Sequence, residues 1–272
     1  MISRRTFLGT SLVALFGEGG YSAFIEPQQL RHERIVVPIA GLPSGLEGLR
    51  IVALTDFHLQ PFTQLAFLKK AVNAANALQP DVVVLLGDFV DATLSAIEDL
   101  APLLGTLRPQ VDVLAVLGNH DYRKGAGYVA ASLQREGITV LRNRGLLLPI
   151  GGTEVHFAGT DSLSGQFDLS EALAGSRAGV PSVLLAHEPD VADVVAQDGR
   201  VALQLSGHSH GGQVRLPGME WASLPLGARK YPFGSYQVGK MFLHTSRGLG
   251  TTGLPIRFGS PPELTEVLLT SV

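Results

Sequence analysis

Apolar runs of strand length alternate with apolar positions at helical spacing through the first half of the chain. The continuous apolar runs cover residues 50–59, 81–91 and 111–121. Runs without polar alternation are typical of strands that are buried on both faces. The segments with helical spacing cover residues 65–78, 93–107 and 126–137. Because strand and helix alternate at this pitch, we expect parallel strands joined by right-handed crossover connections.

The second half of the chain is richer in strand-like segments. They cover residues 138–143, 145–150, 153–161, 181–189, 201–210 and 241–250. Residues 263–271 alternate between apolar and polar positions, so we expect a closing strand there. Two sheets inside and helices outside would bury strands on both faces. This arrangement would account for a mean hydropathy of +0.24 without a membrane span.

Length and composition favour one large domain. The chain has 272 residues, of which 45% are hydrophobic and 17% are charged, so we expect a sizeable core and not a disordered chain. The formal net charge of -3 argues against a general nucleic-acid binder, which would carry a basic stripe. The absence of cysteine excludes disulfides, thiolate nucleophiles and cysteine-bound metal sites.

The first twenty residues resemble a bacterial twin-arginine export signal. Arg4 and Arg5 are followed by Phe7 and Leu8, and a short apolar run extends to Phe16. This run is too short for a comfortable membrane span. An export signal implies the twin-arginine translocase as a partner and the periplasm or cell envelope as the location. The alternative is a frayed basic N-terminus with a small helix.

The expected organisation is a twin-arginine signal or N-terminal anchor over residues 1–29, followed by a single domain over 30–272. A cleavage site needs small residues, and Tyr21–Ser22–Ala23 has a bulky residue where a small one is wanted. We therefore expect the signal to be cut inefficiently or to stay on the protein as an anchor.

Polar side chains recur at one place in strand after strand, just past the end of the apolar run. They are Asp56, His58, Asp88, Asn119, His120, Asp121, His187, His208 and His210. In open α/β sheets, ligands bind at the edge formed by the carboxyl ends of the strands. A single buried histidine is more often a packed core residue. Five of the eight histidines at such ends, beside Asp, Asn or Gly, favour a ligand site instead.

The spacing of these residues indicates a metal site. Residues two apart in an extended chain point the same way, so Asp56 with His58 and His208 with His210 are expected to be two-ligand pairs. Glycines beside them, such as Gly207 and Gly118, would allow the backbone to approach a bound anion.

The motifs DFH, GDFVD, GNHD, AH and GHSH, in this order, resemble the motif series of the calcineurin-like metallophosphoesterase superfamily. Two further strings, GHSHGGQVRLPG and SRGLGTTGLPIRFGSPPELTEVLL, resemble its bacterial YkuE/YaeI-like phosphodiesterase branch. The resemblance covers residues 35–271. One departure is Phe57, where the wider family often has Leu, and this apolar change leaves both neighbouring ligands in place.

The resemblance implies an α/β fold, a four-layer αββα sandwich with two mixed β-sheets flanked by helices. It also implies two divalent metal ions. The first would be held by Asp56, His58, Asp88 and His210. The second would be held by Asp88, Asn119, His187 and His208, with Asp88 bridging. Imidazole, carboxylate and amide ligands suit manganese, iron or zinc and do not choose among them.

The resemblance further implies hydrolysis of a phosphate ester by a metal-bridging hydroxide. His120 would contact the phosphate and protonate the leaving oxygen, and Asp121 would hold the other ring nitrogen of His120. The alternative role for Asp121 is a turn cap. Asp91 is expected to support its loop rather than to bind metal.

The expected function is therefore an exported phosphodiesterase that acts on envelope-associated substrates. One alternative is a pyrophosphate hydrolase for a substrate of the UDP-diacylglucosamine type, in lipid A synthesis. The alternative from another class is a non-catalytic metal-binding scaffold.

The segment 215–234 combines aromatic, apolar and basic residues on a loop rich in Pro and Gly. They are Met219, Trp221, Leu224, Leu226, Tyr231 and Phe233, with Arg215, Arg229 and Lys230. This composition is typical of a membrane-interface rim, so we expect a peripheral membrane contact or a site for the apolar part of a lipid-linked substrate. The alternative is a loop folded down on the sheet edge.

Five other residues are weaker signals. Arg247 and Arg257 suit either a phosphate contact or a structural role such as a salt bridge to Glu263. The remaining histidines, His32, His156 and His244, are expected to be surface or strand residues.

Overall fold

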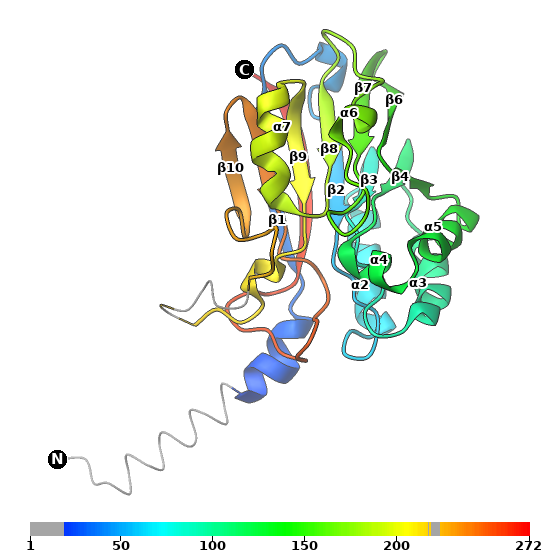
Figure 1. The fold of residues 1–272 in the computed structure, drawn as a ribbon, viewed down its shortest axis with the longest axis vertical. Helices are drawn as coiled ribbons and strands as arrows, with labels where there is room; N and C mark the ends of the chain where they lie inside the picture. Colours follow the sequence, from blue (N-terminus) through cyan, green and yellow to red (C-terminus); the bar gives the residue numbers. More distant parts are fainter. Residues whose placement is uncertain (1–18, 217, 219–223) are drawn as a thin grey trace, which may run out of the picture.

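Two six-stranded sheets pack face to face between layers of helices, as Figure 1 shows for this computed structural model, which describes residues 19–216, 218 and 224–272. The first sheet has the order β1 (Arg31–Ile39), β12 (Glu263–Ser271), β2 (Arg50–Leu54), β3 (Val82–Leu85), β4 (Asp112–Ala115) and β5 (Thr139–Val140). Its neighbouring strands are parallel except for β12 and β2.

The second sheet is also mixed. Its order is β10 (Gly234–Val238), β11 (Met241–Thr245), β9 (Val201–Ser206), β8 (Ser182–Leu185), β7 (Thr153–Gly159) and β6 (Arg144–Ile150). The outer pairs β10–β11 and β6–β7 are antiparallel, and the inner pairs are parallel. The expected four-layer αββα architecture with two mixed sheets is confirmed.

Helices cover the outer face of each sheet. The first sheet is covered by α2 (Leu65–Ala77), α3 (Ile97–Leu104) and α5 (Ala126–Arg135). The second sheet is covered by α6 (Leu169–Ala172) and α7 (Ala192–Asp198). The short α4 (Asn119–Lys124) follows β4 at the edge of the molecule where the parallel strands end.

Strand β3 shows why the apolar runs lack alternation. Val83 and Leu85 pack under the helices, whereas Val82 and Val84 pack between the two sheets, and all four side chains are fully buried. Burying a Val or Leu side chain stabilises the fold by about 1.5–3 kcal/mol relative to leaving it exposed. Apolar side chains thus stabilise the fold on both faces of this strand, and polar residues are confined to the ends of the strand.

The described N-terminal residues pack at the edge where the strands end, as the dark blue segment of Figure 1 shows. The backbone N–H of Arg257 donates to the carbonyl of Ser22 at 2.9 Å. Glu26 is buried, and its carboxylate accepts the backbone N–H of Ser260 at 2.6 Å. Residues just before the predicted domain start at 30 are therefore in contact with the loop that precedes β12. We call these contacts of Ser22 and Glu26 the N-terminal latch.

The paired arginines, Arg4 and Arg5, and the short apolar run of the predicted export signal lie within residues 1–18, outside the described part of the chain. In the part that the structure describes, no helix has the length and apolar character needed to cross a bilayer.

Candidate metal centre and active site

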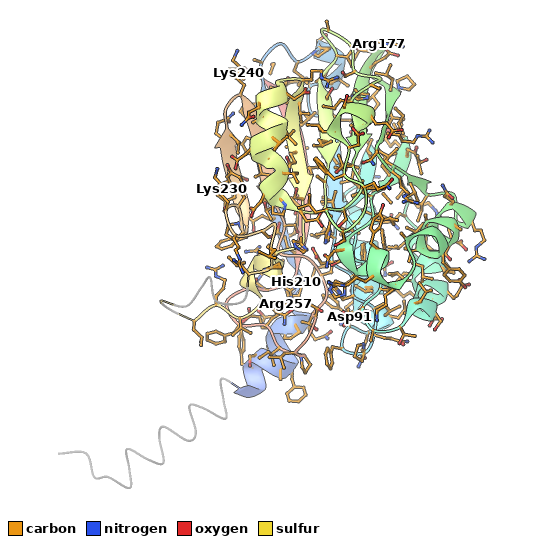
Figure 2. All side chains as sticks on the ribbon, viewed as in Figure 1. Asp91, Arg177, His210, Lys230, Lys240 and Arg257 are labelled. Carbon is orange, nitrogen blue, oxygen red and sulfur yellow. The ribbon has the colours of Figure 1, made fainter. Side chains whose placement is uncertain are left out.

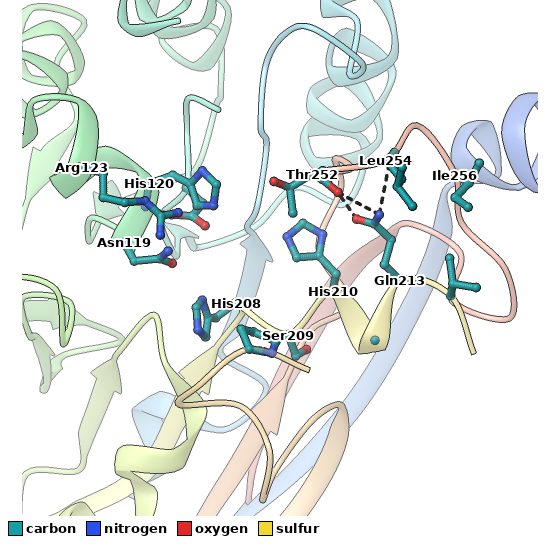
Figure 3. A pocket seen from close by; sticks show the side chains of 15 residues that line it. Asn119, His120, Arg123, His208, Ser209, His210, Gln213, Thr252, Leu254 and Ile256 are labelled. Carbon is teal, nitrogen blue, oxygen red and sulfur yellow. Dashed lines mark hydrogen bonds between the residues drawn. The ribbon is translucent and has the colours of Figure 1, made fainter. Parts of the chain in front are cut away.

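The predicted site residues converge at one edge of the two sheets. Each follows a strand that has already ended: Asp56 and His58 follow β2, Asp88 follows β3, His187 follows β8, and His208 and His210 follow β9. Asn119 and His120 begin α4. Five of them, Asp88, Asn119, His120, His208 and His210, border a cavity of about 460 Å³ (Figure 3). Figure 2 shows His210, Asp91 and Arg257 near this edge, with Arg177 and Lys240 at the opposite end.

The backbone around the ligands is left-handed rather than extended. Asp56, His58, Asp88, His208 and His210 have φ values of 53°, 41°, 54°, 69° and 52°. The predicted reason for pairing residues two apart, a shared face of an extended strand, is therefore wrong. Left-handed turns cost L-residues roughly 1–2 kcal/mol each, and such strain is concentrated at functional sites.

The glycines of these motifs make room for the protein's own carboxylates. A Cβ atom on Gly118 would collide with the Asp88 carboxylate, and one on Gly207 would collide with that of Asp56. The backbone N–H of His208 donates to both oxygens of Asp56, at 3.1 and 3.0 Å. Close backbone approach thus fixes the two buried carboxylates in place.

The first group of ligand atoms comes from Asp56, His58 and His210. All three residues are buried, and their ligand atoms lie within 4.8 Å of one another. The Nε2 atoms of His58 and His210 are 3.0 Å apart, and His210 Nε2 is 3.4 Å from Asp56 Oδ1. These three residues can share one cation.

The second group comes from Asp88, His187 and His208, with Asn119 beside them. Asn119 Oδ1 lies 3.2 Å from His187 Nε2. One oxygen of Asp88, Oδ2, is 3.3 Å from His187 Nε2 and also 3.3 Å from His58 Nε2. Asp88 therefore stands between the two groups, in the position that a bridging ligand requires.

The protons on the histidines leave lone pairs that face the centre. His187 Nδ1 lies 2.7 Å from the carbonyl of Leu86, so this nitrogen donates and Nε2 is free to accept. His208 Nε2 lies 2.9 Å from the carbonyl of Leu226, so its Nδ1 faces inward as an acceptor. Backbone carbonyls that orient histidines in this way are typical of metal sites. The residues present therefore fit divalent metal ions.

Buried negative charge shapes the protonation of the centre. Burial would lower the pKa of His58, but hydrogen bonds to Asp88 and Asp91 and the nearby carboxylate charges raise it to about 9. Burial opposes protonation of His187 as well, yet Asp88 raises its pKa well above the usual value. The carboxylates thus favour positive charge at this place, and a divalent cation would supply it while leaving the inward histidine nitrogens as lone-pair donors.

The contact predicted between His120 and Asp121 is wrong, because Asp91 makes it instead. His120 Nδ1 lies 3.0 Å from Asp91 Oδ1. The Asp91 carboxylate also accepts a hydrogen bond from Thr252 Oγ1 at 3.1 Å. Burial would raise the pKa of Asp91, but hydrogen bonds from His120 and His58 hold it well below its usual range. Asp91 does more than support its loop, since it orients His120.

Asp121 instead holds the loop that carries Asp88. Its carboxylate accepts backbone N–H groups from Asp88, Phe89, Val90 and Gly118, at 2.9, 3.0, 3.3 and 2.9 Å. Burial and the nearby charge of Asp88 raise the pKa of Asp121 to about 7. This is the turn-capping role that the sequence left as an alternative.

Comparison with known proteins agrees with this geometry. The sequence pattern of the calcineurin-like phosphoesterases matches residues 49–212. This chain belongs to that metallophosphoesterase family. It is 35% identical to the uncharacterized metallophosphoesterase YkuE of Bacillus subtilis, over 99% of this chain and 98% of that protein. It is 31% identical to the phosphodiesterase YaeI of Escherichia coli, over 97% of this chain and 98% of that protein.

A solved structure supports the fold alone. The sulfate thiohydrolase SoxB of Thermus thermophilus superposes with a TM-score of 0.51 at 14% identity, over 81% of this chain and 56% of that chain. Metallophosphoesterases use a dinuclear divalent metal site, and the candidate ligand groups for such a site are present here.

The cavity of this metallophosphoesterase has two unlike ends, as Figure 3 shows. Asn119, His120 and Arg123 lie together on the α4 side. Leu254 and Ile256 lie on the other side. The sequence motifs did not point to Arg123, although it follows His120 by three residues and therefore shares its helix face.

The described residues of the segment 215–234 include both buried and exposed side chains. Met219 and Trp221 lie outside the described residues. Leu224 and Tyr231 are buried, as the alternative of a loop packed on the sheet edge expects. Leu226, in contrast, is 77% exposed beside the centre, and its carbonyl is the partner of His208. The Arg215 guanidinium stacks on Phe233, 4.2 Å from the ring centroid.

Arg247 and Arg257 support the loop that lies next to His210. Arg247 pairs with Glu263, with Nε 2.8 Å from Oε2. Arg257 is fully buried and donates to the carbonyls of Ser260, Arg247, Gly248 and Gly250. The Gly250 carbonyl in turn lies 3.3 Å from His210 Nδ1. Neither arginine lines the cavity, so both have the structural role that the sequence left open.

The remaining histidines lie in strands, as expected. His32 of β1 pairs with Glu266 at 2.9 Å, and His244 of β11 pairs with Glu263 at 3.0 Å. His156 of β7 is buried, and its Nδ1 lies 3.1 Å from Ser182 Oγ.

Proposed function

We propose that this metallophosphoesterase is an exported phosphodiesterase that uses two divalent ions held at the centre described above. The observation that carries the proposal is the position of Asp88 Oδ2, 3.3 Å from a histidine nitrogen of each ligand group. Manganese, iron and zinc all suit the mixed oxygen and nitrogen donors.

The bound ions would activate a water molecule as the nucleophile and neutralise charge on the phosphoryl group. Hydrolysis forms a bond from the water oxygen to phosphorus and breaks the bond from phosphorus to the leaving oxygen. His120 lines the cavity and donates the proton that the leaving oxygen needs. The Asp91 carboxylate, 3.0 Å from His120 Nδ1, fixes the orientation of the ring, and His120 then regains a proton from solvent.

The preference for diesters is supported by the full-length similarity to YaeI, which is described as a phosphodiesterase. The apolar end of the cavity supports a substrate with an apolar arm. Leu254 and Ile256 line that end. We therefore infer a substrate of the cell envelope, in which a lipid-like group is joined through phosphate to a polar group.

Export and membrane contact belong to the same proposal. The N-terminal sequence with Arg4 and Arg5 supports export through the twin-arginine translocase, to the periplasm or cell envelope. Leu254, which lines the cavity, is 60% exposed, and Leu226, which follows the cavity residue Pro225, is 77% exposed. Such residues suit contact with a lipid surface.

The first test is hydrolysis of two small esters by protein that has been stripped of metal and reloaded with manganese, iron(II) or zinc. Bis-p-nitrophenyl phosphate reports diester cleavage, and p-nitrophenyl phosphate reports monoester cleavage. We expect metal-dependent cleavage of the diester, and loss of that activity by orders of magnitude in His210→Ala and Asp88→Asn. Absence of bound metal in the wild-type protein would overturn the proposal, and bound metal without cleavage of any phosphate ester would favour the scaffold alternative.

A second measurement addresses the apolar arm of the proposed substrate. Chain-length series of alkyl p-nitrophenyl phosphodiesters should show KM falling as the alkyl arm lengthens, because each buried CH₂ contributes about 0.8 kcal/mol. A KM that is independent of the length of the alkyl arm would contradict an apolar subsite.

A third measurement addresses export. Fractionation of cells that produce the Arg4→Lys, Arg5→Lys protein should show the protein retained inside the cell, and unchanged export would contradict the twin-arginine route.

A further inference from the structure

One charged side chain of the cavity has no part in the reaction as proposed. Arg123 lies on α4, three residues after His120 and on the same helix face. Among the residues that line the cavity, it is the only lysine or arginine. Within the described ranges 19–216, 218 and 224–272, no ion pair includes Arg123. Figure 3 shows its side chain beside Asn119 and His120.

The partner of Arg123 depends on which way the Asn119 amide faces. With the amide nitrogen inward, it donates to His208 Nδ1 at 2.9 Å and to His187 Nε2 at 3.2 Å. The amide oxygen then faces outward and accepts from the two terminal nitrogens of Arg123, at 2.9 and 3.2 Å. The amide nitrogen of Asn119 and the two terminal nitrogens of Arg123 all have acceptors in this orientation, but Asn119 offers no oxygen to a cation.

The opposite orientation suits a metal ligand and leaves Arg123 without its acceptor. Asn119 Oδ1 then faces the inward lone pairs of His187 and His208, a set of three acceptors that a cation satisfies. The amide nitrogen faces the guanidinium, so that two hydrogen-bond donors confront each other. Arg123 must then find an acceptor elsewhere, and it lies at the cavity next to His120.

We propose that Arg123 is the phosphate-recognition residue of this cavity, released for that role when the Asn119 amide turns its oxygen to a metal ion. Its ligand is an oxyanion of a phosphate group, either the phosphoryl group of the substrate or the phosphate of a product. A planar guanidinium matches two phosphate oxygens better than any other side chain. The inference rests on the proposed function, since it names the residue that binds the charged phosphate oxygens of the substrate at the same site.

The position of Arg123 also determines how a phosphodiester would be oriented in the cavity. It stands on the side of Asn119, His187 and His208, whereas Leu254 and Ile256 stand on the other side. A phosphodiester would therefore place its charged oxygens toward α4 and its apolar arm toward the 252–256 loop.

The test is titration of the manganese-loaded full chain with inorganic phosphate, followed by isothermal calorimetry at fixed pH and salt. The Arg123→Gln protein should bind phosphate about 10- to 100-fold more weakly, as expected for loss of hydrogen bonds to a charged group. Arg123→Lys should recover part of the affinity, because the charge remains and the planar fork is lost. Lys124→Gln is the matched control, since Lys124 is the next residue on the same helix and does not line the cavity.

Manganese content and manganese affinity are measured for every variant. Unchanged phosphate affinity in Arg123→Gln with full manganese would overturn the proposal. Loss of manganese in Arg123→Gln would also overturn it, because Arg123 would then act only by holding Asn119. These results are separate from a failure of the proposed function, which would appear as absence of metal-dependent ester cleavage by the wild-type protein.

Discussion

His120 and Asp91 come from loops after two different strands, and their side chains meet at 3.0 Å. The pairing places a carboxylate behind the imidazole that lines the cavity. Thr252, on a third loop, donates to the same Asp91 oxygen at 3.1 Å. The geometry of the proposed acid is thus fixed by segments that are far apart in the sequence.

Replacement of Asp91 by Asn should lower kcat by roughly 10-fold to 100-fold on a diester with a simple alcohol as the leaving group. The loss should be much smaller on bis-p-nitrophenyl phosphate, because p-nitrophenolate leaves without a proton. Steady-state kinetics on both substrates, with metal content measured in parallel, checks this. An equal loss on both substrates would contradict a role for Asp91 in orienting the acid.

Asp121→Ala is the contrasting control. It leaves four backbone N–H groups without their acceptor, so we expect the free energy of unfolding to fall by at least about 3 kcal/mol. Any loss of activity in this variant should be independent of the leaving group, since Asp121 supports the Asp88 loop and does not contact His120.

Residue types and order were enough to predict which side chains gather at the centre. Strand ends in parallel sheets meet at one edge, so the approximate place of Asp56, Asp88 and His208 followed from their positions after apolar runs. The partner of His120 did not follow, because Asp91 and Asp121 are both acidic and both lie near it. Only the direction of each carboxylate separates an orienting residue from a cap, and that direction depends on loop backbone.

At the scale of elements, β12 joins the two halves of the site. Glu263 is its first residue, in the first sheet, and it pairs with His244 of β11 in the second sheet at 3.0 Å. It also pairs with Arg247 at 2.8 Å, just before the glycine-rich loop behind His210. Burial would raise the pKa of Glu263, but the hydrogen bond from His244 and the charges of His244 and Arg247 lower it to about 2.

Ionised Glu263 should stabilise the fold on the order of 3 kcal/mol above pH 4.5. Its pKa is depressed in the folded state, so this contribution is lost as the pH falls from 4.5 toward 2. Glu263→Gln should therefore be less stable than the wild type at pH 7, and the difference should shrink below pH 4.5. Urea unfolding across this range, with a chelator present so that metal release does not contribute, measures the difference.

The exposed pair of Glu98 and Arg135 supplies the comparison for this experiment. Glu98→Gln should change the free energy of unfolding little at any pH, because solvent screens such pairs. A difference between wild type and Glu263→Gln that stays constant from pH 7 to pH 3 would contradict the pH argument.

Most core strands and helices were predictable from periodicity, and the exceptions lie at the edges. Strand β1 was not predicted, because its first four side chains are exposed and charged or polar, so no apolar face is visible in the sequence. Strand β10 was missed because it is an edge strand with alternating exposed positions. The predicted strands were also too long, since β2 ends at Leu54 and β3 at Leu85, before the ligands.

At the scale of the whole molecule, the N-terminal latch connects the start of the described chain to the back of the metal centre. Glu26 accepts the N–H of Ser260, and Ser22 accepts that of Arg257. Arg257 in turn donates to the carbonyl of Gly250, which contacts His210. Three steps of contact thus lead from the N-terminal residues to a predicted metal ligand.

Glu26→Ala should lower the free energy of unfolding by about 1–3 kcal/mol, because it leaves the buried N–H of Ser260 without an acceptor. Manganese affinity should also fall, because the 247–260 loop loses part of its support. Thermal unfolding and metal titration measure the two effects. Glu47→Ala, at an exposed carboxylate that binds Thr270 and Ser271, is the control. Normal stability and normal manganese affinity in Glu26→Ala would contradict a supporting role for the latch.

The latch changes what maturation of this protein would mean. A peptidase that cut after Ala23 would remove Ser22 and leave Glu26 as the third residue of a new, positively charged amino terminus. The removed peptide would then include Ser22, which contacts the folded domain through Arg257. The cleaved protein would lose this support of the loop that contacts His210. A cut at this position would therefore weaken the support of His210, and we predict that the uncut form is the more stable one.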